Sequence, residues 1–162
     1  MNLAGIVEGH PDGATALRWP GGSCTYGELR ARVAAMRGAL VSTGAAPGGR
    51  VALLCGNSPL FVESWLATLG AGATAVPLNP ASPAAELRRE LEAVRPSVVV
   101  VDEAGADAWS GVDGSRFDGL VQVWAGDGAN VAGAVPVASL HRHAPVPVAD
   151  VEPAAHAALL FT

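Results

Sequence analysis

Lysine is missing from this chain of 162 residues, and all ten of its basic residues are arginine. No residue of the chain can therefore act as a lysine base, form a Schiff base or serve as a lysine adenylation site. Cysteine is also scarce, because Cys24 and Cys55 are the only two and they do not form a CxxC pair. This pattern predicts two ordinary thiols in a reduced, cytoplasmic protein.

Charge and long apolar runs are limited as well. Charged residues make up 15% of the chain, and the net charge is −5. The arginines are scattered over predicted helix faces without forming a patch, which argues against a nucleic-acid partner. No apolar stretch approaches the roughly 20 residues that cross a bilayer. Residues 1–10 also lack the basic start of a secretion signal, so we expect neither a membrane span nor export.

The block from Arg50 to Asp102 alternates three short apolar runs with two helices. The runs cover residues 50–55, 74–78 and 98–102. Each helix is expected to begin at a Ser-Pro pair, the first at Ser58-Pro59 and the second at Ser82-Pro83. In each pair serine is the expected N-cap and proline lies in the first turn. Apolar runs without polar alternation suit strands that are buried on both faces. The block therefore predicts an α/β fold, a mostly parallel sheet with helices on both faces.

The flanking regions complete one domain over residues 1–162. A short helix and a strand at Thr15–Trp19 are predicted first, followed by a turn at Gly21-Gly22. Thr25 and Glu28 have the spacing of a capping box, which begins a helix that ends at Gly44. Beyond the central block we expect an exposed connection at 104–119 with one short helix, a strand at 120–124, a loop at 126–130, a short helix within 135–140, an extended loop at 141–152 and a last apolar strand at 157–161.

Four groups of residues together resemble a known family. In chain order they are Thr25–Leu29 (TYGEL), Arg50–Leu54 (RVALL) with Asn57-Ser58, Gly70–Ala73 (GAGA) through Val76–Pro80 (VPLNP), and Ala158–Thr162 (ALLFT). Their order and spacing resemble the N-terminal part of the AMP-forming acyl-CoA synthetases and adenylating ligases. The resemblance runs through nearly the whole chain and implies the N-terminal subdomain of a larger AMP-binding domain.

The resemblance implies an ATP-dependent ligase of carboxylic acids and CoA as the parent enzyme. Such an enzyme forms an acyl-adenylate and pyrophosphate, and then transfers the acyl group to a thiol. ATP, Mg and CoA are the implied cofactors, and a fatty acid or related organic acid is the implied substrate. In the family, a strand like Ala158–Phe161 leads into a Thr-Ser-Gly-Thr-Thr-Gly loop and a lysine that hold the ATP phosphates. Thr162 matches the first residue of that loop, and it is the one cofactor-binding residue expected here.

The rest of this loop, the acyl pocket and the catalytic lysine are not among the 162 residues. We therefore expect the isolated chain to bind no cofactor and to be inactive, with no catalytic residue and no metal ligand of its own. Two alternatives remain open: a non-enzymatic half-domain that acts as an interaction module, and part of a peptide-synthetase adenylation domain. A flavodoxin-like nucleotide binder is disfavoured, because no predicted strand is followed by a glycine-rich phosphate turn.

The turn at Gly70–Ala75 superficially matches the dinucleotide fingerprint GxGxxA. That fingerprint works only where a strand precedes the glycines and a helix follows them, so that the helix N-terminus meets the pyrophosphate. Here the predicted helix comes first and the predicted strand second. We interpret these glycines as a helix stop and a tight turn.

Other polar residues have structural interpretations. His10, His141, His143 and His156 have no Cys or carboxylate at ligand spacing nearby, so we interpret them as solvated loop histidines. Ser58 is explained by the helix start, and Trp65 is predicted to lie in the core or an interface. Asp102 and Glu103 follow a strand end, where ligands of open sheets often bind, but a surface turn is the default interpretation.

Self-association is the last expectation from the sequence. The apolar run Ala157–Phe161 would form an unpaired edge strand if nothing covered it, and few charges are available to protect that edge. We therefore expect the isolated chain to form dimers or larger species.

Overall fold

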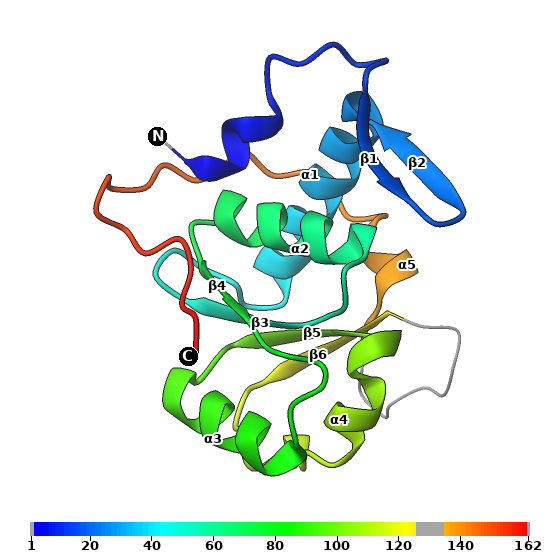
Figure 1. The fold of residues 1–162 in the computed structure, drawn as a ribbon. Coiled ribbons are helices and arrows are strands. Elements are labelled where there is room, and N and C mark those ends of the chain that lie inside the picture. The colour runs from blue at the N-terminus through cyan, green and yellow to red at the C-terminus, as the bar shows by residue number, and fades with distance from the viewer. Residues whose placement is uncertain (1, 126–134, 162) are drawn as a thin grey trace.

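The computed structural model describes residues 2–125 and 135–161, and its centre is a five-stranded parallel sheet (Figure 1). The strand order is β4-β3-β5-β6-β7. The strands are β3 (Arg50–Leu54), β4 (Thr74–Pro77), β5 (Val98–Asp102), β6 (Val121–Ala125) and β7 (Val135–Pro136). Val51 in the centre pairs with Ala75 on one side and with Val98 on the other. The predicted α/β fold with a parallel sheet is confirmed.

Helices cover both faces of the sheet, and each face has its own apolar core. The helices are α1 (Tyr26–Ser42), α2 (Pro59–Gly70), α3 (Ala84–Val94), α4 (Ala106–Ser110) and α5 (Val137–Leu140). Alternate strand residues, such as Leu53 and Leu54, point into opposite cores. The first core contains residues of α1 and α2, and the second contains residues of α3 together with Trp109 of α4. The sheet is therefore doubly wound.

The predicted starts of α1 and α2 are confirmed. Thr25 and Glu28 form the reciprocal capping box, with Thr25 N–H donating to Glu28 Oε2 at 2.8 Å. Ser58 caps α2 by accepting from Phe61 N–H at 3.3 Å. The predicted stop of α2 is confirmed too, because Gly72 has a φ of 76°, which glycine adopts without steric cost. The helix precedes this turn and β4 follows it, which excludes the dinucleotide interpretation.

The predicted serine cap of α3 is wrong. Pro83 occupies the N-cap position of α3, and no side chain caps this helix. The reason is that the carbonyl of Pro83 already accepts the first helical hydrogen bonds, from Glu86 and Leu87 N–H. Ser82 lies one position earlier and donates its N–H to the carbonyl of Asn79 within a turn.

An antiparallel hairpin precedes α1, and the sequence predicted only half of it. The strand β1 (Thr15–Trp19) was expected, but the turn at Gly21-Gly22 leads into a second strand, β2 (Gly22–Thr25). Gly21 has a φ of 92°, which suits a short hairpin turn. The N-terminal helix is present as a 3-10 helix, η1 (Leu3–Val7), which packs on α2.

The region after β5 is more structured than predicted. Two 3-10 turns, η2 (Glu103–Gly105) and η3 (Gly114–Arg116), flank α4. Trp109 of α4 is buried and belongs to the second core, so this connection is not an exposed one throughout. The predicted strand at 120–124 corresponds to β6, and the predicted helix within 135–140 to α5. The predicted loop at 126–130 lies outside the described residues.

The predicted last strand is reduced to a single bridge. Ala158 lies beside Ala75 of β4 in parallel orientation, with Ala75 N–H donating to Ala157 O and Leu159 N–H donating to Ala75 O, both at 3.0 Å. The next residue of β4 on this side is Pro77, which has no N–H to extend the ladder. Within the described residues, no helix has the length and apolar character that crossing a membrane requires.

Candidate functional site: a groove at the switch point of the sheet

The strand order places a topological switch point between β3 and β5. From β3 the chain passes through α2 to β4 on one side, and then crosses back through α3 to β5 on the other side. Ligands of open α/β sheets bind in the crevice outside the carboxyl ends of the strands at such a point. An open groove of about 700 Å³ lies here, lined by residues 56–60 after β3 and 102–104 after β5.

Asp102, at the end of β5, organises the floor of this groove. The sequence favoured a surface turn here, but Asp102 is only 7% exposed, so that interpretation is wrong. Its carboxylate accepts hydrogen bonds from Gly56 N–H at 3.1 and 3.0 Å, from Ser58 Oγ at 3.1 Å, and from the N–H groups of Ala104 at 3.0 Å and Gly105 at 3.3 Å. Donors from both loops therefore hold this carboxylate, and Asp102 fixes the two loops relative to each other.

The tight approach of these loops explains two local features. A Cβ at Gly105 would lie 2.3 Å from Leu54 O, so only glycine fits against the end of β3. Burial, and then the charge of Asp102, raise the pKa of the Cys55 thiol well above its ordinary value. Cys55 is therefore an unreactive core thiol, whereas the sequence predicted only an ordinary one. Ser58 donates to Asp102 in addition to capping α2, so both of its side-chain contacts are structural.

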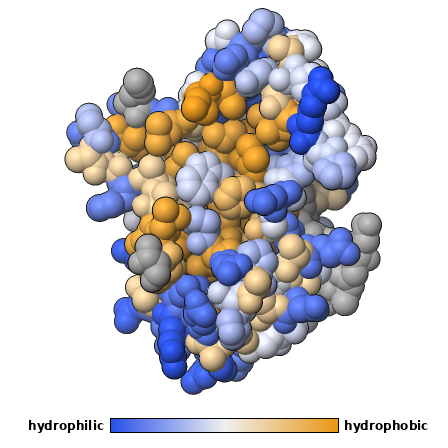
Figure 2. Space-filling model, in the orientation of Figure 1, coloured by the Kyte–Doolittle hydropathy of each residue, from blue (hydrophilic) through white to orange (hydrophobic). Residues whose placement is uncertain are grey.

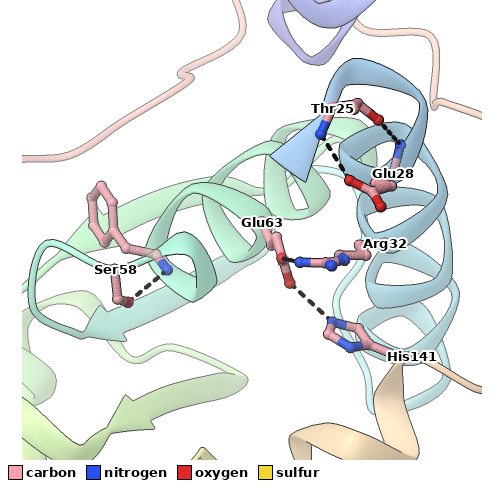
Figure 3. A network of polar contacts seen from close by, with 7 residues as sticks. Thr25, Glu28, Arg32, Ser58, Glu63 and His141 are labelled. Atoms are coloured by element: carbon pink, nitrogen blue, oxygen red, sulfur yellow. Dashed lines mark hydrogen bonds and ion pairs between the residues drawn. The ribbon is translucent and has the colours of Figure 1, made fainter. Parts of the chain in front are cut away.

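Arg32, Glu63 and His141 form a polar network on one wall of the groove (Figure 3). Arg32 comes from α1, Glu63 from α2, and His141 follows α5. The side chain of Glu63 is only 4% exposed, and its oxygens lie 3.4 Å from Arg32 Nη1 and 2.9 Å from His141 Nε2. His141 lies in an exposed turn, as predicted, but its contact with Glu63 was not predicted.

This network was not predicted from the sequence, because its members are far apart in the chain. One signal was available: Glu63 is the single charged residue of α2, on an otherwise apolar helix. A charge on such a helix, if buried, needs a partner. No local spacing could have identified His141 as that partner, because 78 residues separate the two.

His10, His143 and Trp65, which the sequence also singled out, do not line this groove. His143 Nδ1 lies 3.4 Å from Ser42 Oγ, and His10 stacks on Tyr26. Within residues 2–125 and 135–161, no three His, Cys, Asp or Glu side chains are grouped to hold a metal ion. Trp65 packs against the first core, as predicted.

Thr162 lies outside the described residues, so its role in phosphate binding stays a prediction. The run before it is described, and the bridge from Ala158 to Ala75 is parallel to β4. The run therefore heads toward the carboxyl edge of the sheet, the same edge that holds the groove.

Comparison with known proteins identifies the family. Residues 4–162 match the family of AMP-binding enzymes, and the chain belongs to it. The chain is 47% identical over 66 residues, 41% of its length, to a feruloyl-CoA synthase of an Amycolatopsis species. It is 35% identical over 115 residues, 70% of its length, to an L-proline–[L-prolyl-carrier protein] ligase of Streptomyces coelicolor. The chain spans only 13% and 21% of these two relatives, and 3% of a naringenin synthase from Pestalotiopsis fici.

Solved structures share the fold. The N-terminal domain of FACL13 from Mycobacterium tuberculosis superposes with a TM-score of 0.84 at 22% identity, covering all of this chain and 42% of that one. The anthranilate CoA ligase AuaEII, solved with anthranoyl-AMP, superposes with a TM-score of 0.81 at 23% identity, covering 96% of this chain and 30% of that one. At this identity, the likeness establishes the N-terminal fold of adenylate-forming ligases.

Proposed function

We propose that this chain is the N-terminal part of an ATP-dependent carboxylic acid:CoA ligase, in which it forms the N-terminal subdomain of a larger AMP-binding domain. The observation that carries the proposal is the family match over residues 4–162, together with a fold found in adenylate-forming ligases. In the reaction, the substrate carboxylate attacks the α-phosphorus of ATP and releases pyrophosphate. The thiol of CoA then attacks the acyl carbonyl of the adenylate and releases AMP.

The proposed roles of ATP, Mg and CoA belong to the whole enzyme. Thr162 would begin the loop that holds the ATP phosphates, and Mg would neutralise their charge. The parallel direction of the run before Thr162 supports this placement, because it leads to the ligand-binding edge of the sheet.

Two kinds of acyl acceptor are compatible with the relatives. We favour CoA with a fatty or related organic acid as substrate, because Pro77-Leu78-Asn79-Pro80 resembles the acyl-CoA synthetases. A feruloyl-CoA synthase among the relatives is in keeping with CoA as acceptor. The carrier-protein ligase favours the second candidate, an adenylation domain of the peptide-synthetase type.

The coding sequence that follows Thr162 tests the proposal. We expect it to continue into a Ser-Gly-Thr-Thr-Gly-like loop and a lysine. A stop codon directly after Thr162 would contradict the proposal and favour a non-enzymatic half-domain that acts as an interaction module.

We also propose that the isolated chain associates with itself. Hydrophobic residues gather on the surface over α2 and η1, whereas hydrophilic residues dominate around α3 (Figure 2). Leu3 and Ile6 of η1 are 61% and 70% exposed, and Leu160 is 66% exposed. Exposed apolar surface of this kind favours contacts with another molecule. Light scattering over a concentration series tests this, and a strictly monomeric profile at high concentration would contradict it.

A further inference from the structure

The network of Arg32, Glu63 and His141 has hydrogen-bonding capacity that the fold itself does not use. A guanidinium carries five N–H groups, and among the described residues Arg32 bonds only to Glu63, through Nη1. The ring of His141 contacts Glu63 through Nε2, which leaves Nδ1 without a partner in this part of the chain. Both side chains are partly open to solvent, at 39% and 32% exposure, and both line the groove.

The buried carboxylate of Glu63 makes this a built arrangement. It contacts a cationic group from α1 and the imidazole that follows α5, so both side chains are held on one wall of the groove (Figure 3). Arg32 places a permanent positive charge at this end of the groove, and His141 lies beside it. Asp102 also lines the groove, but its carboxylate already accepts hydrogen bonds from Gly56, Ser58, Ala104 and Gly105. Glu103 lines the groove from the loop after β5 and repels an anion from that side.

The rest of the groove wall suits an organic body. Trp19, Pro59 and Leu60 line it, and they add an aromatic ring and two aliphatic side chains to the polar network. A ligand that fits both parts carries an oxyanion on an apolar group. A guanidinium group can donate paired hydrogen bonds to two oxygens of either a carboxylate or a phosphate, so the same arginine can recognise both.

We propose that the groove at the switch point binds an organic oxyanion, a carboxylate or a phosphate, with Arg32 as the donor, His141 beside it in the groove wall, and Glu63 as the residue that positions both. All these residues lie in the described part of the chain. The site therefore stands independently of the phosphate loop proposed to begin at Thr162, and its failure would leave the ligase proposal untouched.

Calorimetric titration of the chain with inorganic phosphate and with benzoate tests the site, and the two arms distinguish a phosphate-bearing from a carboxylate-bearing ligand. We expect saturable binding of at least one probe, which weakens as salt is added. Arg32→Gln should weaken it about tenfold or more, since a charge-assisted pair of hydrogen bonds is lost. His141→Gln should weaken it several-fold.

Two matched controls separate the site from general charge effects. Arg89→Gln removes an exposed arginine of α3, and His143→Gln removes a histidine that does not line the groove. Both should bind the probe within about twofold of the parent, because surface charges are largely screened in salt. Arg32→Lys keeps the charge but loses the planar fork, so it should be intermediate.

A purely structural role for the network predicts a different result. In that case the variants would lose stability, but no probe would bind the parent chain in a saturable way. Absence of saturable binding to both probes, or binding that Arg32→Gln leaves unchanged, would overturn the proposal. A measurement on the parent chain alone avoids any folding defect of the variants: the ring resonances of His141 should shift on titration with the bound probe, and unshifted resonances would contradict the site.

Discussion

The two faces of the central sheet are completed in different ways. On one face, α3 is amphipathic: it buries Leu87, Leu91 and Val94 and presents charged residues to solvent. On the other face, α2 is apolar on its outer side as well, where Phe61 and Trp65 are only partly buried. Figure 2 shows this difference as a polar surface around α3 and an apolar one over α2 and η1.

Long-range polar contacts are concentrated on the α1/α2 face. Glu63 contacts His141, Arg37 Nε donates to Val146 O at 2.8 Å, and Asn2 Nδ2 donates to Ala149 O at 3.1 Å. Each contact ties this face to the segment that returns after α5. Local amphipathicity therefore suffices for the α3 face, whereas the α1/α2 face depends on residues that are remote in sequence. Substitutions on the two faces should differ accordingly in their effect on stability.

Asp102 joins the two faces, because its donors lie in the loops that lead to α2 and to α4. We expect Asp102→Ala to lower the free energy of unfolding by about 3 kcal/mol, since several partly buried donors lose their acceptor together. Urea unfolding measures this. Asp107→Ala, an exposed aspartate on α4, is the control and should stay within about 0.5 kcal/mol. Equal effects of the two substitutions would show that Asp102 does not hold the loops.

Glu63 and Glu92 compare the two faces directly. Glu63→Gln should lower the free energy of unfolding by about 2 kcal/mol, because it weakens two contacts of a buried carboxylate. Glu92→Gln changes an exposed glutamate of α3 in the same way and should have little effect. If both variants unfold at the parent's urea midpoint, the long-range network does not stabilise the α1/α2 face.

The capping box gives a smaller, local effect on the same face. Glu28→Ala should lower the free energy of unfolding by about 1 kcal/mol, because Thr25 N–H loses its acceptor. Thr25→Ala should cost a similar amount, and the double variant should cost less than the sum, since the two residues act together. Additive losses in denaturant melts would mean that the box does not form as a unit.

Substitution of Glu90 on α3 should change the free energy of unfolding least, and it should raise this free energy instead of lowering it. Burial, and then the nearby charge of Glu86, raise the pKa of Glu90 above its ordinary value. A carboxyl whose pKa is higher in the folded state stabilises the fold at low pH, and that contribution is lost as the pH rises through the folded pKa. Glu90→Gln should therefore be slightly more stable than the parent at pH 7.

The advantage of Glu90→Gln should disappear when the pH falls below about 4, where the carboxyl is protonated in both states. Thermal melts at the two pH values measure this. A variant that is less stable than the parent at pH 7 would contradict the assigned direction of the shift.

The fold was largely predictable from the sequence because its signals are local. Apolar runs such as Val98–Asp102 identified the buried strands, and the spacing of Thr25 and Glu28 identified a helix start. Errors occurred where a backbone detail decided the outcome. Pro83 took the cap position at α3, and Pro77 limited the outer edge of β4 to one bridge.

The candidate site was much less predictable, because its contacts are non-local. Asp102 was noticed at a strand end, but its burial depends on the loop after β3, 46 residues earlier. The partnership of Glu63 and His141 depends on how three separate segments pack, and no spacing in the sequence encodes it. Resemblance to a family supplied the proposed reaction but not this groove.

Exchange of labelled pyrophosphate into ATP, driven by an added carboxylic acid, is the decisive test of the proposed function. It should be measured with a panel of fatty, aryl and amino acids on the isolated 162-residue chain and on the longer protein that is proposed to continue past Thr162. We predict acid-dependent exchange for the longer protein and none above a boiled control for the isolated chain, which has no lysine and only Thr162 of the phosphate loop. Exchange catalysed by the isolated chain, or its absence with every acid in the longer protein, would contradict the proposal.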